Sequence, residues 1–115
     1  LQFDRTKAMR FLYEPFRFTR PADVCVAPDE TGYLFVVDSE RDSLYQFTSK
    51  GYEGVNPPPS SGLTKQVPAS FGGFGSGPFQ FKGPSGVAYF RRTLYVADRG
   101  NNRVMRYRLS SDLER

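Results

Sequence analysis

Short apolar runs alternate with turn-forming residues along most of the chain. The runs are rich in branched and aromatic side chains, which favour extended structure, and each is too short for a typical helix. Pro, Gly and Asp lie between them and favour turns, because they preset or tolerate the backbone angles that a turn requires. The pattern predicts two groups of three antiparallel strands, at residues 24–27, 33–37 and 44–47 and at residues 86–90, 93–97 and 103–109.

The two groups are copies of one unit. Residues 15–24 align with residues 78–87 at an offset of 63, with five identities in ten positions. Residues 34–38 align with residues 94–98 at an offset of 60. An internal repeat of short strands about ten residues apart favours a β-propeller over a sandwich or a barrel, and one propeller blade is a four-stranded meander. The predicted fold class is therefore all-β, with antiparallel blades of a propeller.

Each unit shows three of the four strands of a blade, so the outer strand must lie elsewhere. Residues 65–71 are the candidate for the first unit, and the same alignment makes residues 9–12 the outer strand of a neighbouring blade. The predicted organisation is an outer strand within residues 1–14, a first blade at 15–77 with a long loop at 51–75, and a second blade at 78–115 without its outer strand.

The second unit resembles the NHL repeat. It has a Gly-rich segment at residues 71–77, a Gly-Pro-x-Gly turn at 83–86, and an aliphatic strand that ends in Asp98 and is followed by Asn102 and Arg103. The first unit resembles the repeat more loosely. Arg20 and Asp23 stand at the positions of Gly83 and Gly86, and Asp42-Ser43 replaces Asn102-Arg103. The resemblance implies a propeller of about six blades, of which this chain would supply about two.

We expect the motif residues to be structural. Gly83 and Gly86 suit unusual backbone angles or close strand approach, and Pro84 can begin a strand without losing a ladder donor. Asp98 can accept bonds from turn amides while Arg103 returns to pair with it. The residues of this predicted scaffold are Pro21, Asp38, Asp42, Gly83, Pro84, Gly86, Asp98, Asn102 and Arg103.

Composition excludes most catalytic sites. The chain has no His and one Cys, so imidazole-based catalysis and internal disulfides are excluded. Cys25 lies in an apolar run and is expected to be a small buried side chain. We predict no catalytic, metal-binding or cofactor-binding residue and no enzymatic activity. The resemblance leaves one enzymatic alternative, a fragment of a propeller lyase or hydrolase whose catalytic residues lie in other blades.

Charge and blade count indicate the partners. The net charge is +4, but residues 21–77 carry seven acidic and three basic groups while residues 78–115 carry three and eight. Two blades cannot close a ring, which takes about four to eight. We expect further blades of a longer chain, a protein partner, or a head-to-tail homotrimer in which acidic first blades face basic second blades. No apolar stretch reaches the roughly 18 residues of a membrane span.

The expected function is a non-enzymatic protein-binding scaffold, a propeller subunit or fragment within a larger assembly. The long loop and the basic turns supply the candidate contacts, which are Tyr52, Phe71, Phe74, Arg91, Arg92 and Arg99. A disordered surface insertion is the alternative interpretation of the loop. The resemblance also suggests an extracytoplasmic location, either periplasmic or secreted.

Single-stranded RNA binding is the second functional hypothesis. The second unit combines basic and aromatic residues, namely Arg91, Arg92, Arg99, Arg103, Arg106 and Arg108 with Tyr89, Tyr95 and Tyr107. On a strand, however, Arg106 and Arg108 share one face and Tyr107 points to the other. A solvated edge strand protected by arginines is the competing interpretation.

Overall fold

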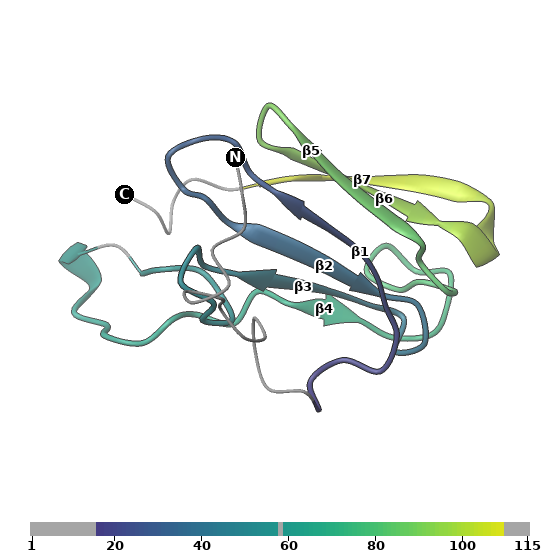
Figure 1. Ribbon diagram of the computed structural model, residues 1–115, viewed down its shortest axis with the longest axis horizontal. Helices are drawn as coiled ribbons and strands as arrows, with labels where there is room; N and C mark the ends of the chain where they lie inside the picture. Colours follow the sequence, from purple (N-terminus) through teal and green to yellow (C-terminus); the bar gives the residue numbers. More distant parts are fainter. Residues whose placement is uncertain (1–15, 58, 110–115) are drawn as a thin grey trace, which may run out of the picture.

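The computed structural model describes residues 16–57 and 59–109, which form two antiparallel sheets (Figure 1). The first sheet has the order β1-β2-β3-β4, with β1 at Pro21–Val26, β2 at Leu34–Asp38, β3 at Ser43–Phe47 and β4 at Phe71–Gly72. The second sheet has the order β5-β6-β7, with β5 at Gly86–Phe90, β6 at Thr93–Asp98 and β7 at Arg103–Arg108. The prediction of an all-β fold built from antiparallel meanders is confirmed, and the number of blades in a complete propeller stays a prediction.

The outer strand of the first sheet is shorter than predicted. Within the run at 65–71 and the glycine that follows it, Phe71 and Gly72 pair with β3, so most of the run is not a strand of the sheet. The rest of the β3 edge is occupied by the loop itself, because Glu53 bridges Phe47 and the Gly54 N–H donates to the Gln46 carbonyl at 2.8 Å. The loop at 51–75 nevertheless has structure, because Val55 bridges Val67 and residues Pro59–Ser61 form a 3-10 turn. The predicted strand at 9–12 lies outside the described residues.

The two sheets repeat one pairing register. Phe35 lies opposite Gln46 in the first sheet, and Tyr95 lies opposite Arg106 in the second. Both pairs are separated by the same sequence offset of 60, so the alignment of the two units is also an alignment of their strands. The positions of β1, β2 and β3 therefore have counterparts in β5, β6 and β7.

The hydrophobic core lies between the two sheets, which pack against each other (Figure 1). The ring of Phe35 from β2 stacks on the ring of Tyr89 from β5, with centroids 6.2 Å apart and an interplanar angle of 12°. The buried core residues are Ala27, Tyr33, Phe35, Val37, Leu44, Val55, Phe81, Val87, Leu94 and Val96. Strand alternation turns the neighbouring residues to the opposite faces.

Two free faces result, one on each sheet. We call the residues Val24, Val26, Leu34, Val36, Tyr45 and Phe47 the first free face, which points away from the second sheet. We call the residues Ala88, Tyr95, Ala97, Val104, Arg106 and Arg108 the second free face, which points away from the first sheet.

Within residues 16–57 and 59–109, no helix is long and apolar enough to cross a membrane.

Three side-chain hydrogen bonds join the sheets. Asp23 Oδ2 accepts the N–H of Val87 at 2.9 Å, and Asp42 Oδ1 accepts the N–H of Gly83 at 2.7 Å. The hydroxyl of Tyr89 donates to Asp29 Oδ2 at 2.5 Å. Hydrogen bonds from Thr31 and then Tyr89 lower the pKa of Asp29, whereas desolvation and the same bond raise the pKa of Tyr89. The relative position of the two sheets is thus held at several points around the core.

Candidate interaction surfaces

The turn after β6 is held by a buried aspartate. Asp98 is 0% exposed and accepts hydrogen bonds from the Lys82 N–H at 2.8 Å and the Asn101 amide at 2.7 Å. Arg103 donates to Asp98 at 2.8 Å and to the carbonyls of Ser76, Gly77 and Gln80 at 2.9 to 3.0 Å. Desolvation raises the pKa of Asp98, but these donors outweigh it and hold the pKa below its ordinary value. Asp98 and Arg103 therefore tie the Gly-rich segment to the sheet.

The first unit builds the same turn with different partners. Asp38 is 0% exposed and accepts the N–H groups of Thr19, Arg20, Glu40 and Arg41 at 2.6 to 3.0 Å. Desolvation raises its pKa, and the four backbone donors bring the pKa below the ordinary value. Ser43 stands at the position of Arg103, and Arg41 donates instead to Thr19 Oγ1 at 2.6 Å.

The other predicted scaffold residues lie at turns and strand ends. Asp42 and Asn102 occupy counterpart positions, and both have φ of 52°. Gly83 has φ of 63°, Pro84 is fully buried, and Pro21 begins β1. Gly86 differs from the expectation, because its φ is not positive and an added Cβ would meet its nearest atoms at 3.6 Å, an ordinary contact distance.

Phe71, one of the predicted loop contacts, does not form an exposed surface. It is half-buried and lies in an aromatic cluster with Phe79, Phe81 and Tyr107, whose ring centroids are 5.0 to 5.9 Å away. Tyr52 and Phe74, by contrast, are 57% and 73% exposed. The ammonium group of Lys82 lies 5.5 Å from the centroid of the Phe74 ring.

The predicted basic contacts lie at opposite ends of β6. Arg91 and Arg92 form the β5–β6 turn with φ of 49° and 61°, while Arg99 is exposed in the turn after β6. Strand β6 has six residues, which span about 20 Å. These three arginines therefore do not form one cluster.

The residues considered for RNA binding are divided between two faces. Tyr89 stacks on Phe35 in the core, and the Tyr107 hydroxyl donates to the Pro78 carbonyl at 2.7 Å. Tyr95 lies on the second free face with Arg106 and Arg108. Of the three tyrosines, only Tyr95 shares a surface with these arginines.

An apolar cavity opens on the first free face. Its volume is about 520 Å³, and its lining comprises Phe18, Pro21, Ala22, Asp23, Val24, Leu34 and Val36. Val24 and Val26 are 54% and 56% exposed. Phe18 covers part of the face, because its ring contacts Tyr45 with centroids 5.1 Å apart. Val36, Tyr45 and Phe47 of this face are buried, so the exposed apolar part of the face is formed by Val24 and Val26.

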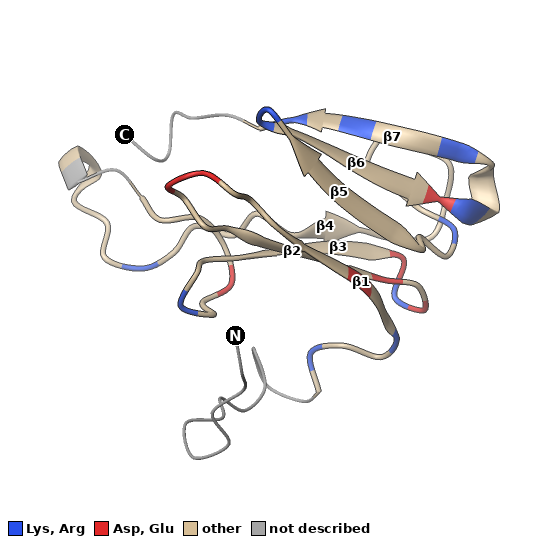
Figure 2. Ribbon diagram, turned by 45° about the horizontal axis from the view of Figure 1, so that its top comes forward, with Lys and Arg blue, Asp and Glu red and all other residues tan. Residues whose placement is uncertain are grey.

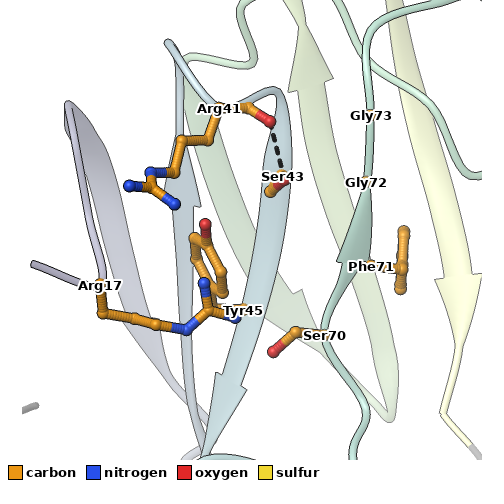
Figure 3. A pocket seen from close by; sticks show the side chains of 8 residues that line it. All are labelled: Arg17, Arg41, Ser43, Tyr45, Ser70, Phe71, Gly72 and Gly73. Atoms are coloured by element: carbon orange, nitrogen blue, oxygen red, sulfur yellow. Dashed lines mark hydrogen bonds between the residues drawn. The ribbon is translucent and has the colours of Figure 1, made fainter.

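A polar cavity of about 460 Å³ lies beside β3 and β4 (Figure 3). Figure 3 shows Arg17 and Arg41 near Tyr45, and Arg17 lies 4.2 Å from the Tyr45 ring centroid. Arg17 also donates two hydrogen bonds to Glu53, at 2.7 and 2.8 Å, and this pairing lowers the pKa of Glu53. The Ser43 hydroxyl donates to the Arg41 carbonyl at 2.8 Å. Both guanidinium groups already have acceptors, so this cavity is built mainly by structural contacts.

A basic cavity of about 320 Å³ lies on the second free face, lined by Thr93, Tyr95, Arg106 and Arg108. Figure 2 shows Lys and Arg repeated along β7, whereas Asp and Glu gather on the turns of the first sheet. Sequence reasoning treated Arg106 and Arg108 as solvated edge residues and did not select them as protein contacts. The signal that identifies them is the shared register, which makes them counterparts of the buried residues Gln46 and Thr48.

No three His, Cys, Asp or Glu side chains gather to hold a metal ion in the part of the chain that the structure describes.

Comparison with known proteins agrees with the architecture. A search of curated proteins finds no match to the chain. The family model of the NHL repeat matches residues 81–107, which contain β5, β6 and most of β7. The chain therefore contains an NHL repeat, a β-propeller unit of the type associated with protein interaction.

Proposed function

We propose that the chain is a non-enzymatic protein-binding scaffold, contributing two NHL-type blades at residues 15–77 and 78–115 to a larger assembly. The observation that carries the proposal is the first free face. Val24 on this face is 54% exposed, while its counterpart Val87 in the second sheet is 6% exposed because the first sheet covers it. The same position is thus buried in one unit and open in the other.

The exposed valines favour a covering protein. Burial of a valine side chain contributes about 1.5–3 kcal/mol, so covering the half-exposed Val24 and Val26 contributes about 1 kcal/mol each. The face continues into the cavity lined by Phe18, Leu34 and Val36. A contiguous apolar surface of this kind indicates an interaction site. A further blade, a protein partner or a second copy in a head-to-tail ring would each cover it.

The RNA-binding alternative has less support. A single-stranded nucleic acid platform needs several aromatic rings beside its basic groups. Tyr89 and Tyr107 instead pack on the opposite side of the sheet from Arg106 and Arg108. The described residues therefore favour a protein partner.

Solution mass and dye binding test the proposal. We expect the purified chain to show a light-scattering mass above 13.0 kDa that grows with concentration, or to bind the apolar dye ANS. A mass of three times 13.0 kDa would identify the closed trimer. The variant V24T/V26T should lower whichever signal is present, because it removes apolar area while keeping the branched shape. The control L63T, at an exposed loop position, should not. A monomer that binds no ANS would contradict the proposal.

A further inference from the structure

We propose that the second free face is a docking surface for a protein sheet or strand that brings carboxylates to Arg106 and Arg108. This inference rests on the proposed scaffold function and names the chemistry of one partner. The first free face is apolar and the second is basic, so the two ends of the blade pair select different surfaces.

The two sheets have equivalent faces. Phe35 and Leu44 point from the first sheet toward the second, and they are 1% and 3% exposed. Their counterparts by register are Tyr95 and Val104, and Val104 is 64% exposed. The molecule therefore uses this type of face once as a sheet-to-sheet contact and leaves the equivalent face open.

The two equivalent faces differ in charge. The counterparts of Arg106 and Arg108 are Gln46 and Thr48, which are 9% and 3% exposed. A body that covered the second free face in the same way would remove water from two guanidinium groups. Removing an ion from water without a counter-charge costs several kcal/mol, so an apolar surface would be rejected. The covering body must therefore supply carboxylates.

Arg106 and Arg108 are available to a partner. Neither Arg106 nor Arg108 has an ion-pair partner within residues 16–57 and 59–109. Arg103, on the same strand, is already bound to Asp98. The two available guanidinium groups stem from positions two residues apart on one face of β7, about 7 Å along the strand. A partner strand with acidic residues at alternate positions has the matching repeat.

The described surfaces disfavour the other occupants. A second copy would present the first free face, where Arg17 lies over Tyr45 and Glu53 is already bound to Arg17. Asp23 also lines the cavity of that face, but its carboxylate already accepts the N–H groups of Val24 and Val87, at 2.9 Å each, so it is engaged before a second copy could bring it to Arg106. A single-stranded RNA would find one tyrosine, Tyr95, in the cavity instead of a row of aromatic platforms. An acidic protein surface fits the available groups better than either.

The test uses the full chain and a defined probe. The probe is a fluorescein-labelled peptide of alternating Glu and Val, with a control peptide of alternating Gln and Val, and binding is followed by fluorescence anisotropy. The variant R106Q/R108T gives the second sheet the residues that the first sheet has at these positions, so the fold is expected to persist. The control variant K50Q/K65Q removes the same number of positive charges from exposed loop sites of the first unit, away from the face.

We expect the unmodified chain to bind the Glu peptide at least about ten-fold more tightly than the Gln peptide. R106Q/R108T should lose about ten-fold in affinity, and K50Q/K65Q should stay within about two-fold. Equal losses in both variants, or equal binding of both peptides, would overturn the inference by showing an effect of net charge or of non-specific contact.

Two further outcomes would assign the face to another occupant. Binding of a labelled oligouridine that only R106Q/R108T abolishes, without Glu-peptide binding, would make the face an RNA site. A solution mass that only R106Q/R108T lowers, without peptide binding, would make it a contact between copies. V24T/V26T reports on the first free face alone, so failure of the scaffold proposal there is distinguishable from failure here.

Discussion

Replacing Arg103 with alanine should destabilise the chain by about 3 kcal/mol. The side chain is 27% exposed and donates to the fully buried Asp98 carboxylate and to three carbonyls of the segment at residues 76–80. Loss of the charged partner of Asp98 accounts for about 1.5–2 kcal/mol, because the Lys82 and Asn101 donors remain. The three carbonyls lie near the surface and can rebind water, so they account for about 0.5 kcal/mol each.

Urea unfolding provides the measurement, followed by far-UV circular dichroism or by the fluorescence of the seven tyrosines, since the chain has no Trp. R103K keeps the charge without the planar fork and should lose roughly half as much stability as R103A. R99A is the control, because Arg99 is exposed in the neighbouring turn and should be nearly neutral. A loss below about 1 kcal/mol for R103A would refute the reasoning that the Asp98 to Arg103 pair holds the turn.

Three further predictions concern two carboxylates, a half-buried thiol and a glycine. The pKa values of Asp38 and Asp98 lie below the ordinary 3.8, so their stabilisation should be present above about pH 5 and lost as the pH falls through the lowered values. Urea midpoints from pH 6 to 2.5 should show this fall, with a weaker dependence in D98N. Burial, with a smaller contribution from nearby Asp23, raises the pKa of Cys25 to about 11. Iodoacetamide should therefore react with Cys25 at pH 8 about 100-fold more slowly than with a thiol of pKa 9.0, and unfolding in urea should remove the difference. G54A should cost about 2–3 kcal/mol in urea unfolding, since its φ is 108° and a Cβ would lie 2.4 Å from the Val67 carbonyl; an unchanged midpoint would contradict this.

Strand positions could be predicted from the sequence because local patterns determine them. Alternation at residues 33–37 and 93–97 places one set of side chains in the core, and the structure has strands β2 and β6 there. The offset of 60 between the units reappears as an identical register. The outer strand was less predictable, because the pairing of β3 with Phe71 depends on how a long loop with Pro68 returns to the sheet.

Contacts between distant residues determine the surfaces, and local patterns do not show them. Phe71 has the composition of an exposed loop aromatic, yet the Gly-rich segment folds back and places it against Phe79 and Tyr107. The ion pair of Arg17 with Glu53 joins residues 36 positions apart. Arg106 has the sequence pattern of a solvated edge residue. Its proposed role as a partner contact follows from the burial of Gln46, its register counterpart in the first sheet.

Asp23 and Asp42 accept hydrogen bonds from the second unit, and this has a consequence for how proteins built from repeated units diverge. Both carboxylates bind backbone N–H groups, those of Val87 and Gly83, and not side chains. Every residue except proline offers that donor, so the receiving unit can exchange its side chains at these positions without breaking the connection. A duplicated unit inserted beside such an aspartate would find its anchor already present. The contact between the two units therefore permits recombination of units with divergent sequences. This agrees with the five identities in ten positions that remain between residues 15–24 and 78–87.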